Sequence, residues 1–168
     1  MRILGIDPGT IVAGYGIIDC EEDNISFVCC DALRCKQRSP IGERLCYIYD
    51  EICSVIEKYH PDVMAVEQPF VDKNIRSALL IGKAQAIAIL AAGKHHIPCF
   101  EYSPMQIKQG VTSYGACSKE QVQQMVKLQL NLKEIPEPND AADALAVAIC
   151  HISSVHLNDI MNSQGDKK

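Results

Sequence analysis

Three apolar stretches near the start of the chain have the length and residue types of β-strands. They cover residues 2–7, 13–19 and about 25–34, and each contains several Ile, Val or other strand-favouring residues. Short turn-like links separate them, one through Pro8-Gly9-Thr10 and one through residues 21–24. Because such short links join antiparallel neighbours, the pattern predicts an antiparallel meander.

Helical spacing of apolar residues begins after this meander. Leu, Ile, Val and Tyr recur every three or four positions between 40 and 59, which predicts an amphipathic helix that ends at His60-Pro61-Asp62. Residues 63–67 form a short apolar run and predict a fourth strand. A wide apolar face over 74–94 predicts a second helix, and residues 97–102 predict a fifth strand.

The last third of the chain is predicted to be mainly helical. Ser118-x-x-Gln121 is a capping-box pattern, so a helix should begin there and run to about Leu130. A proline-bearing loop at 134–139 then leads to a final helix over about 140–153. Beyond His156 the sequence is polar and aperiodic, which predicts a loose tail.

The order of these elements, β-β-β-α-β-α-β-α-α, defines the expected fold class. It predicts an α/β protein with a mixed five-stranded sheet flanked by helices, which is the ribonuclease H-like order. The sequence has no internal repeat and no interdomain linker. We therefore expect one domain over residues 1–156 and a polar C-terminal tail over residues 157–168.

Composition narrows the class of protein. The chain has 168 residues, of which 48% are hydrophobic, so it can build one globular domain with a substantial core. We find no apolar run of membrane-span length, and Met1 leads directly into a strand without a secretory segment. Nine Cys residues, an odd number with no C-x-x-C pair, favour reduced thiols over disulfides or a zinc site. We therefore expect a cytoplasmic protein.

Charge is distributed unevenly along the chain, whose net charge is −5. Residues 70–133 hold eight basic and three acidic residues, or +5, and the remainder is therefore −10. A protein of negative total charge can still bind a polyanion through one basic face, because salt screens distant charges over about 8 Å. A solvated, asymmetric surface explains the same numbers, so charge alone leaves a nucleic-acid partner open.

Four carboxylates stand where apolar elements end or begin. Asp7 ends the first predicted strand, Glu67 ends the fourth, and Asp140 and Asp143 open the alanine-rich final helix. Four acids gathered at one place would repel one another unless a cation lay between them. Mg²⁺ and Mn²⁺ prefer such oxygen ligands, and a pair of these ions is a common device for cutting phosphodiesters.

Each acid also has an ordinary structural explanation. Asp7 precedes Pro8-Gly9 and could serve as a turn residue, and Glu67 could be a strand-terminal residue that faces solvent. Asp140 in the first turn of a helix offsets the macrodipole, which contributes about 0.3–1 kcal/mol. Asp143 lies on the same helix face, where a second acid repels the first. The joint placement of the four residues therefore favours the metal site.

Several motifs resemble the RuvC family of bacterial Holliday junction resolvases, the crossover junction endodeoxyribonucleases. The similarity extends over about residues 1–154. The segments that carry it are Ile3-Leu-Gly-Ile-Asp-Pro-Gly-Thr10 with Gly14-Tyr-Gly16, Val66-Glu-Gln-Pro-Phe70, Phe100-Glu-Tyr102, Gln106-Ile-Lys108 and Asn139-Asp-Ala-Ala-Asp-Ala-Leu-Ala146. The first motif alone is weak, because several nucleotide-binding families share Asp-x-Gly-Thr. The complete set is specific.

The resemblance implies a function and a metal site. It implies a homodimer that resolves four-way DNA junctions by two symmetric Mg²⁺-dependent nicks during recombination and repair, with a branch-migration motor (RuvA and RuvB) as partner. Asp7, Glu67, Asp140 and Asp143 would be the catalytic metal ligands for two Mg²⁺ ions, with Mn²⁺ as a substitute. One ion would lie between Asp7 and the final acidic pair, and the other between Asp7 and Glu67, roughly 3.5–4 Å apart.

The resemblance also implies a set of DNA contacts. Phe70 would be a wedge that stacks on junction bases, which is worth about 1–3 kcal/mol per base. Lys108 would neutralise charge on the scissile phosphate in the transition state, and Lys119 would lie near the same strand. The remaining expected DNA contacts come from the segment after Phe70 and the helix that follows it, and they are Lys73, Asn74, Arg76 and Lys83.

Three other functions are compatible with parts of this sequence. An ATP-handling domain of the actin and hexokinase type also begins with Asp-x-Gly-Thr, but it usually needs a second related domain that 168 residues cannot hold. A nuclease of the same fold acting on RNA would keep the acids without needing the Phe70 wedge. A non-enzymatic junction-binding scaffold would have no need of all four acids.

Overall fold

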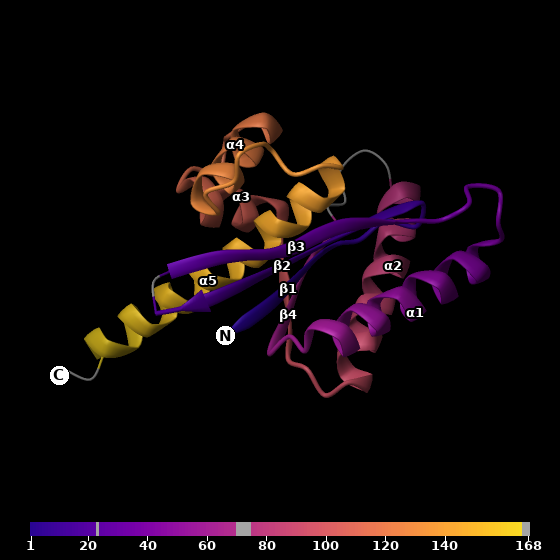
Figure 1. The fold of residues 1–168 in the computed structure, drawn as a ribbon, viewed down its shortest axis with the longest axis horizontal. Helices are drawn as coiled ribbons and strands as arrows, with labels where there is room; N and C mark the ends of the chain where they lie inside the picture. Colours follow the sequence, from indigo (N-terminus) through magenta and orange to yellow (C-terminus); the bar gives the residue numbers. More distant parts are fainter. Residues whose placement is uncertain (23, 70–74, 166–168) are drawn as a thin grey trace.

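A single mixed sheet organises the chain (Figure 1). The structure is a computed structural model that describes residues 1–22, 24–69 and 75–165. The strands lie in the order β3-β2-β1-β4-β5. Their bounds are β1 Arg2–Asp7, β2 Val12–Glu21, β3 Asn24–Arg34, β4 Val63–Glu67 and β5 Cys99–Tyr102. The five predicted strands are thus confirmed, and two of them have the predicted ends while the ends of the others differ by at most two residues.

Both strand directions occur within this sheet. The first three strands pair antiparallel, as the short links between them require, and β4 and β5 join β1 in parallel. The parallel pairing of β1 with β4 places Ile3 opposite Val63 and Ile6 opposite Val66. The next residues along these two strands are Asp7 and Glu67. The carboxyl ends of the two central strands therefore meet at one edge of the sheet.

Helices cover both faces of the sheet (Figure 1). One face packs against α1 (Ile41–Tyr59) and α2 (Ile75–Lys94), and the other packs against α3 (Pro104–Thr112), α4 (Lys119–Gln129) and α5 (Asn139–Gly165). Alternate residues of β1 supply the two cores, with Leu4 on the α1 side and Ile3 on the α5 side.

Two predictions about the helices were wrong. Helix α3 was not predicted, because its nine residues give too short a periodic run. Its start nevertheless carries a readable signal, since Ser103 and Gln106 form the same reciprocal capping box as Ser118 and Gln121. The final helix does not end near residue 153, and it continues to Gly165 through much of the tail that we expected to be loose. No Pro or Gly interrupts that stretch before Gly165.

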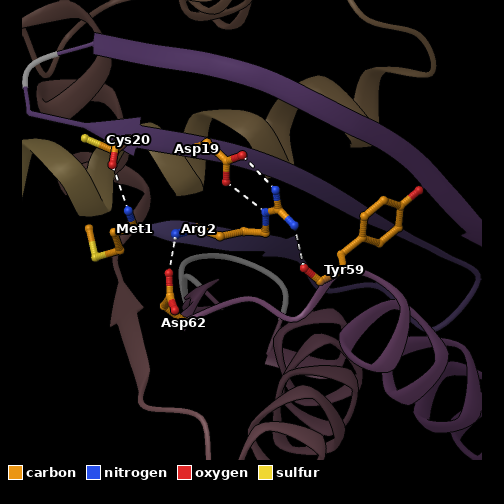
Figure 2. Close-up of polar contacts among 6 residues, drawn as sticks. All are labelled: Met1, Arg2, Asp19, Cys20, Tyr59 and Asp62. Carbon is orange, nitrogen blue, oxygen red and sulfur yellow. Dashed lines mark hydrogen bonds and ion pairs between the residues drawn. The ribbon is translucent and has the colours of Figure 1, made fainter.

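A group of hydrogen bonds fixes the sheet at the end opposite Asp7 (Figure 2). The Arg2 guanidinium donates to both carboxylate oxygens of Asp19 at 2.8 Å and to the carbonyl of Tyr59, while the backbone N–H of Arg2 donates to Asp62. The Asp19 hydrogen bonds raise the pKa of Arg2 and lower that of Asp19. This partly exposed ion pair contributes at most about 1 kcal/mol and ties β1 to β2. The bonds to Tyr59 and Asp62 tie β1 to the end of α1 and to the residue before β4.

Helix α2 is long and apolar enough to cross a membrane, whereas we expected no apolar run of that length. Length and composition are weak evidence for a membrane helix, because core helices of globular proteins have the same properties. Its alanines at 78, 84, 88, 91 and 92 are buried, and it packs against α1 and the sheet.

The nine cysteines are free thiols as predicted, although only Cys20, Cys117 and Cys150 are fully buried.

Candidate active site

Asp7 and Glu67 are neighbours at the ends of β1 and β4. The register that pairs Ile6 with Val66 brings Asp7 and Glu67 next to each other one residue later. Side chains alternate along a strand, so Asp7 shares a face with Ile3, whose side chain lies in the core beneath α5. The two carboxylates therefore project toward the start of α5 from adjacent strands.

The first turn of α5 is seated directly over this pair. Gly14 on β2 lies opposite Asp7, and a Cβ added at Gly14 would overlap the carbonyl oxygen of Asp140 far inside van der Waals distance. Only a glycine permits so close an approach of helix to sheet. Asp143 follows Asp140 by three residues and so lies on the same helix face. The fold thereby brings the four acids of the sequence prediction together.

The acids influence one another strongly. Burial raises the pKa of Asp7 to about 8, with further contributions from the charges of Glu67, Asp143 and Asp140. Burial and the Asp143 charge raise the pKa of Glu67 to about 7. Burial also raises the pKa of Asp143, against the opposing effect of Lys119. A cation placed among these carboxylates would favour their ionised forms and offset the cost of their burial and mutual repulsion.

Lys119 is the cation that the structure shows among these acids. Its Nζ forms an ion pair with Asp143 Oδ2 at 2.5 Å from the first turn of α4. Burial lowers the pKa of Lys119, but the hydrogen bond to Asp143 and the charges of Asp7 and Asp140 outweigh burial and raise it. Lys119 also lowers the pKa of Asp7 and Glu67. The residue that we expected near the scissile strand thus lies within the acidic cluster.

A cavity of about 300 Å³ opens beside the acids and contains a second predicted cation. Its lining residues are Glu67, Pro104, Ile107, Lys108, Lys119, Val122, Asp143 and Ala146. Three of them, including Lys108, belong to α3, the helix that the sequence analysis missed. Lys108 therefore borders the same cavity as Glu67 and Asp143.

Helix α4 adds a polar residue that sequence reasoning did not identify. Gln123 is 8% exposed, lies one helical turn after Lys119 and acts on the pKa of Asp143. Its Nε2 makes no hydrogen bond within the described part of the chain. A buried amide donor without a partner is uncommon, and this one lies close enough to Asp143 to lower the pKa of that carboxyl. The i, i+4 spacing of Lys119 and Gln123 was the only signal available in the sequence.

The donor set fits a hard divalent cation. Carboxylate oxygens are the ligands that Mg²⁺ and Mn²⁺ favour, and the mutual repulsion of the four acids would be relieved by positive charge. In the positions that the side chains take within residues 1–22, 24–69 and 75–165, no three His, Cys, Asp or Glu groups surround one point at ligand distance. Three carboxylates could therefore hold one metal ion only after a rearrangement of these side chains.

The other expected DNA contacts divide into two groups. Phe70, Lys73 and Asn74 lie outside the described residues, so their predicted roles stay predictions. Arg76 and Lys83 are exposed on α2 and make no ion pair with any described residue. They lie on the opposite face of the sheet from α5, so they are not part of the acidic cluster.

Two of the acids end adjacent strands, and the other two begin a helix that crosses those strands. This arrangement defines the class of ribonuclease H-like nucleases. Comparison with known proteins narrows this class. The family model for crossover junction endodeoxyribonuclease RuvC matches residues 3–151. The chain belongs to this family, whose members are endodeoxyribonucleases that cleave phosphodiester bonds at crossover junctions and depend on divalent metal.

Individual relatives agree with the family match. A crossover junction endodeoxyribonuclease RuvC of Dehalococcoides mccartyi is 59% identical over 166 residues, which is 99% of each chain. The structure of Thermus thermophilus RuvC has a TM-score of 0.87 at 31% identity and covers 94% of this chain and 97% of that one. The structure of T. thermophilus RuvC in complex with a Holliday junction has a TM-score of 0.88 at 31% identity and covers 94% of this chain and 96% of that one. These matches confirm the fold class and favour a junction nuclease over the ATP-handling, RNA-cleaving and non-enzymatic alternatives.

The raised pKa values of Asp7 and Glu67 give a prediction for the metal-free protein. Both acids hold protons in the folded state up to a higher pH than in the unfolded chain, whose carboxyls titrate near pH 4. The folded state therefore binds more protons, and the free energy of unfolding falls as pH rises from about 4 to 8. In EDTA we expect a loss of several degrees in Tm between pH 5.5 and 8.5.

Two variants show whether this loss comes from the acidic cluster. Asp7→Asn should remove much of the pH slope and be more stable than the unaltered protein at pH 8, by about 1–3 kcal/mol. Glu57→Gln, which alters an exposed acid on α1, should leave the slope unchanged. Equal slopes for all three proteins would show that burial and the neighbouring acids do not raise the pKa of Asp7 as the structure indicates.

Proposed function

We propose that Asp7, Glu67, Asp140 and Asp143 hold two Mg²⁺ ions and that the chain uses them to resolve four-way DNA junctions by two symmetric nicks. The observation that carries this proposal is the gathering of four acids from three elements at one end of the sheet, where burial and then the charges of Glu67, Asp143 and Asp140 raise the pKa of Asp7 to about 8. Bound there, the ions would supply Lewis-acid stabilisation of phosphate charge and activation of water. Mn²⁺, which has the same ligand preferences, should substitute.

The side chains divide the work of binding and charge compensation. Asp7 lies between the strand partner Glu67 and the helix pair Asp140 and Asp143, so it is suited to contact both ions. Lys108, on the wall of the cavity, neutralises the charge that develops on the scissile phosphate. Lys119, which is paired with Asp143 in the metal-free protein, would be free to bind a phosphate oxygen of the DNA if a cation took its place beside that acid.

We propose that a homodimer supplies the two nicks. A junction is nearly two-fold symmetric, so a two-fold dimer offers it two equivalent sites. On α2, Ile75, Leu79 and Leu90 are 62%, 64% and 50% exposed and fall within about 60° of one another around the helix axis. An exposed apolar stripe of this kind suits burial against a second copy. We also propose that a branch-migration motor of the RuvA and RuvB kind is a partner of this dimer and that both act in the cytoplasm.

Cleavage of synthetic substrates tests the proposed activity. The unaltered protein should nick a synthetic four-way junction at two symmetry-related positions, depend on added Mg²⁺ and leave ends that a ligase can rejoin. Linear duplex of the same sequence and an RNA–DNA hybrid serve as controls and should be cut at least a hundredfold more slowly, on the order expected when a site is built for one geometry. Equal cleavage of duplex and junction, or cleavage in EDTA, would overturn the proposal.

Phe70 provides a separate test of junction specificity. If its ring stacks on junction bases, Phe70→Ala should lose about 1–3 kcal/mol of interaction at the step in which bases are unstacked. We expect the single-turnover cleavage rate of a junction to fall at least tenfold, while the Kd in Ca²⁺ changes less than threefold. Phe27→Ala, which truncates an exposed Phe on β3, is the matched control. Normal turnover of the Phe70 variant would exclude the wedge.

A further inference from the structure

A cavity of about 280 Å³ lies at the junction of β3 and α1, outside the site described above. It is formed by the end of the strand, the link that follows it and the first two turns of the helix. Its lining residues are Arg34, Cys35, Lys36, Ser39, Glu43, Arg44 and Tyr47. Neither the sequence motifs nor the acidic cluster involves any of these residues.

Positive charge dominates this cavity. Three cationic side chains line it against one carboxylate, and Arg38 in the same link adds a fourth cation nearby. In the described part of the chain the ion pairs are those of Arg2 and Lys119, so the cations of the cavity have no acidic partner there. Arg34 and Lys36 are exposed. Unpaired cations around a hollow attract an anion.

Arg44 is held in place by a hydrogen bond to a backbone carbonyl, and no carboxylate of the described residues neutralises its charge. Its Nη1 donates to the carbonyl of Thr10 at 3.1 Å, which fixes the guanidinium against the loop that follows β1. Its Nε is buried and has no hydrogen-bond partner among the described residues. The guanidinium thus keeps its full charge and part of its donor capacity, and a bidentate anion such as phosphate matches the geometry of that group.

The start of α1 adds a second feature that favours an anion. Pro40 occupies the N-cap position and makes no capping hydrogen bond, so the first amides of a 19-residue helix lack a side-chain acceptor. The positive end of the helix dipole lies at the same place. Ser39, Glu43 and Arg44 all line the cavity, so the cavity borders this uncapped turn. Phosphate groups bind at such helix starts.

The cavity lies at the same end of the sheet as the acids. Arg34 pairs with Val12 on β2, two residues before Gly14, which pairs with Asp7. Strand spacing and rise put the Cα atoms of Arg34 and Asp7 about 12 Å apart. In Figure 1 the β3–α1 link projects from the end of the sheet at which α5 begins. A DNA strand whose bond is held at the acids can therefore extend to this cavity within a few nucleotides.

We propose that this cavity binds a backbone phosphodiester of the DNA substrate, a few nucleotides from the bond that is cleaved. The proposal rests on the proposed function for its ligand. Arg34, Lys36 and Arg44 contact the phosphate, and the amides at the start of α1 complete the contact. Such contacts give no information about the base sequence, but they set the position of the strand on the protein. The site therefore aligns a junction arm with the four acids.

A pair of double variants tests this phosphate site in the full-length protein. Arg34→Gln/Lys36→Gln removes two exposed cations of the cavity, and Lys58→Gln/Lys94→Gln removes two exposed cations at the opposite end of the sheet. With a four-way junction in Ca²⁺, we expect the first variant to bind about tenfold more weakly at 0.1 M salt. Its slope of log Kobs against log [salt] should be shallower by about one to two, and the control variant should change neither quantity appreciably.

Neutral phosphate substitution identifies the ligand directly. Single methylphosphonates placed along the first five phosphates on each side of the cleaved bond should include one position that weakens binding by the unaltered protein about threefold. The same substitution should weaken binding less in Arg34→Gln/Lys36→Gln, because two of the three cations that contact this phosphate are already absent. Inorganic phosphate at millimolar concentration should compete weakly at most. Equal losses in both proteins at every position, or equal behaviour of the two double variants, would overturn the proposal.

Failure of this site and failure of the proposed activity give different results. Mg²⁺-dependent nicking by the unaltered protein tests the activity, whereas the comparison of the two double variants uses binding alone. Nicking with no difference between the double variants would remove the phosphate site and leave the activity intact. Absence of any junction binding would overturn both.

Discussion

Asp7→Asn is expected to abolish Mg²⁺-dependent nicking of a four-way junction, with a loss of at least a thousandfold in single-turnover rate. The reason is positional, because Asp7 lies between Glu67 on the neighbouring strand and the two acids of α5. An amide keeps the shape of the carboxylate but removes the charge that binds a cation. The measurement is the rate of product formation at saturating protein with Mg²⁺ varied.

Junction affinity separates loss of chemistry from loss of folding or binding. In Ca²⁺ the Kd of Asp7→Asn should stay within about threefold of that of the unaltered protein, because DNA affinity comes mainly from cationic contacts to phosphates. The variant should also be the more stable of the two at pH 8 in EDTA, since a repelled charge has been removed. Retained nicking by this variant would exclude Asp7 from the metal site.

Gly14→Ala is expected to lower the free energy of unfolding more than any other glycine-to-alanine change near the acidic cluster. A Cβ at Gly14 would overlap the backbone carbonyl of Asp140, and no side chain can move aside to relieve the overlap. The first turn of α5 would have to leave the sheet, which costs on the order of 3 kcal/mol for overpacking of this kind. Asp140 and Asp143 would move with it, so we expect nicking to fall at least a hundredfold.

Chemical denaturation and a matched glycine variant check this expectation. The midpoint of urea unfolding should fall for Gly14→Ala. Gly93→Ala on α2, where an added Cβ meets nothing within 4 Å, should leave stability unchanged or raise it by about 0.5–1 kcal/mol. A Gly14→Ala protein as stable and as active as the unaltered one would show that α5 does not approach β2 as closely as the structure indicates.

The core architecture could be predicted from the sequence because its signals are local. Asp7 and Glu67 each end an apolar run, and parallel pairing of two such runs brings their ends together. The capping box at Ser118 and the alanine-rich start of α5 marked two helix starts in the same way. Family motifs then added what spacing could not, namely which acids act together.

What could not be predicted depends on contacts between segments distant in sequence. The ion pair of Lys119 with Asp143 joins residues 24 positions apart, and no local pattern signals that a lysine will enter an acidic cluster. Because helix α3 was not predicted, the residues that it contributes to the wall of the cavity beside the acids were not predicted either. Charge counting along the chain assigned the basic face to residues 70–133, although Arg34, Lys36 and Arg44 form a basic cavity in the acidic remainder. Charge averaged over a long segment hides a cluster that folding creates.

Crystals grown with Mn²⁺ provide the most direct measurement, through anomalous scattering from the metal. If the four acids form the metal site, anomalous density should lie within coordination distance of Asp7 and of at least one carboxylate from β4 or α5. Lys119 Nζ should then have left Asp143. A metal-soaked crystal with the Lys119–Asp143 pair intact and no anomalous density near Asp7, at Mn²⁺ concentrations that support nicking, would contradict the account.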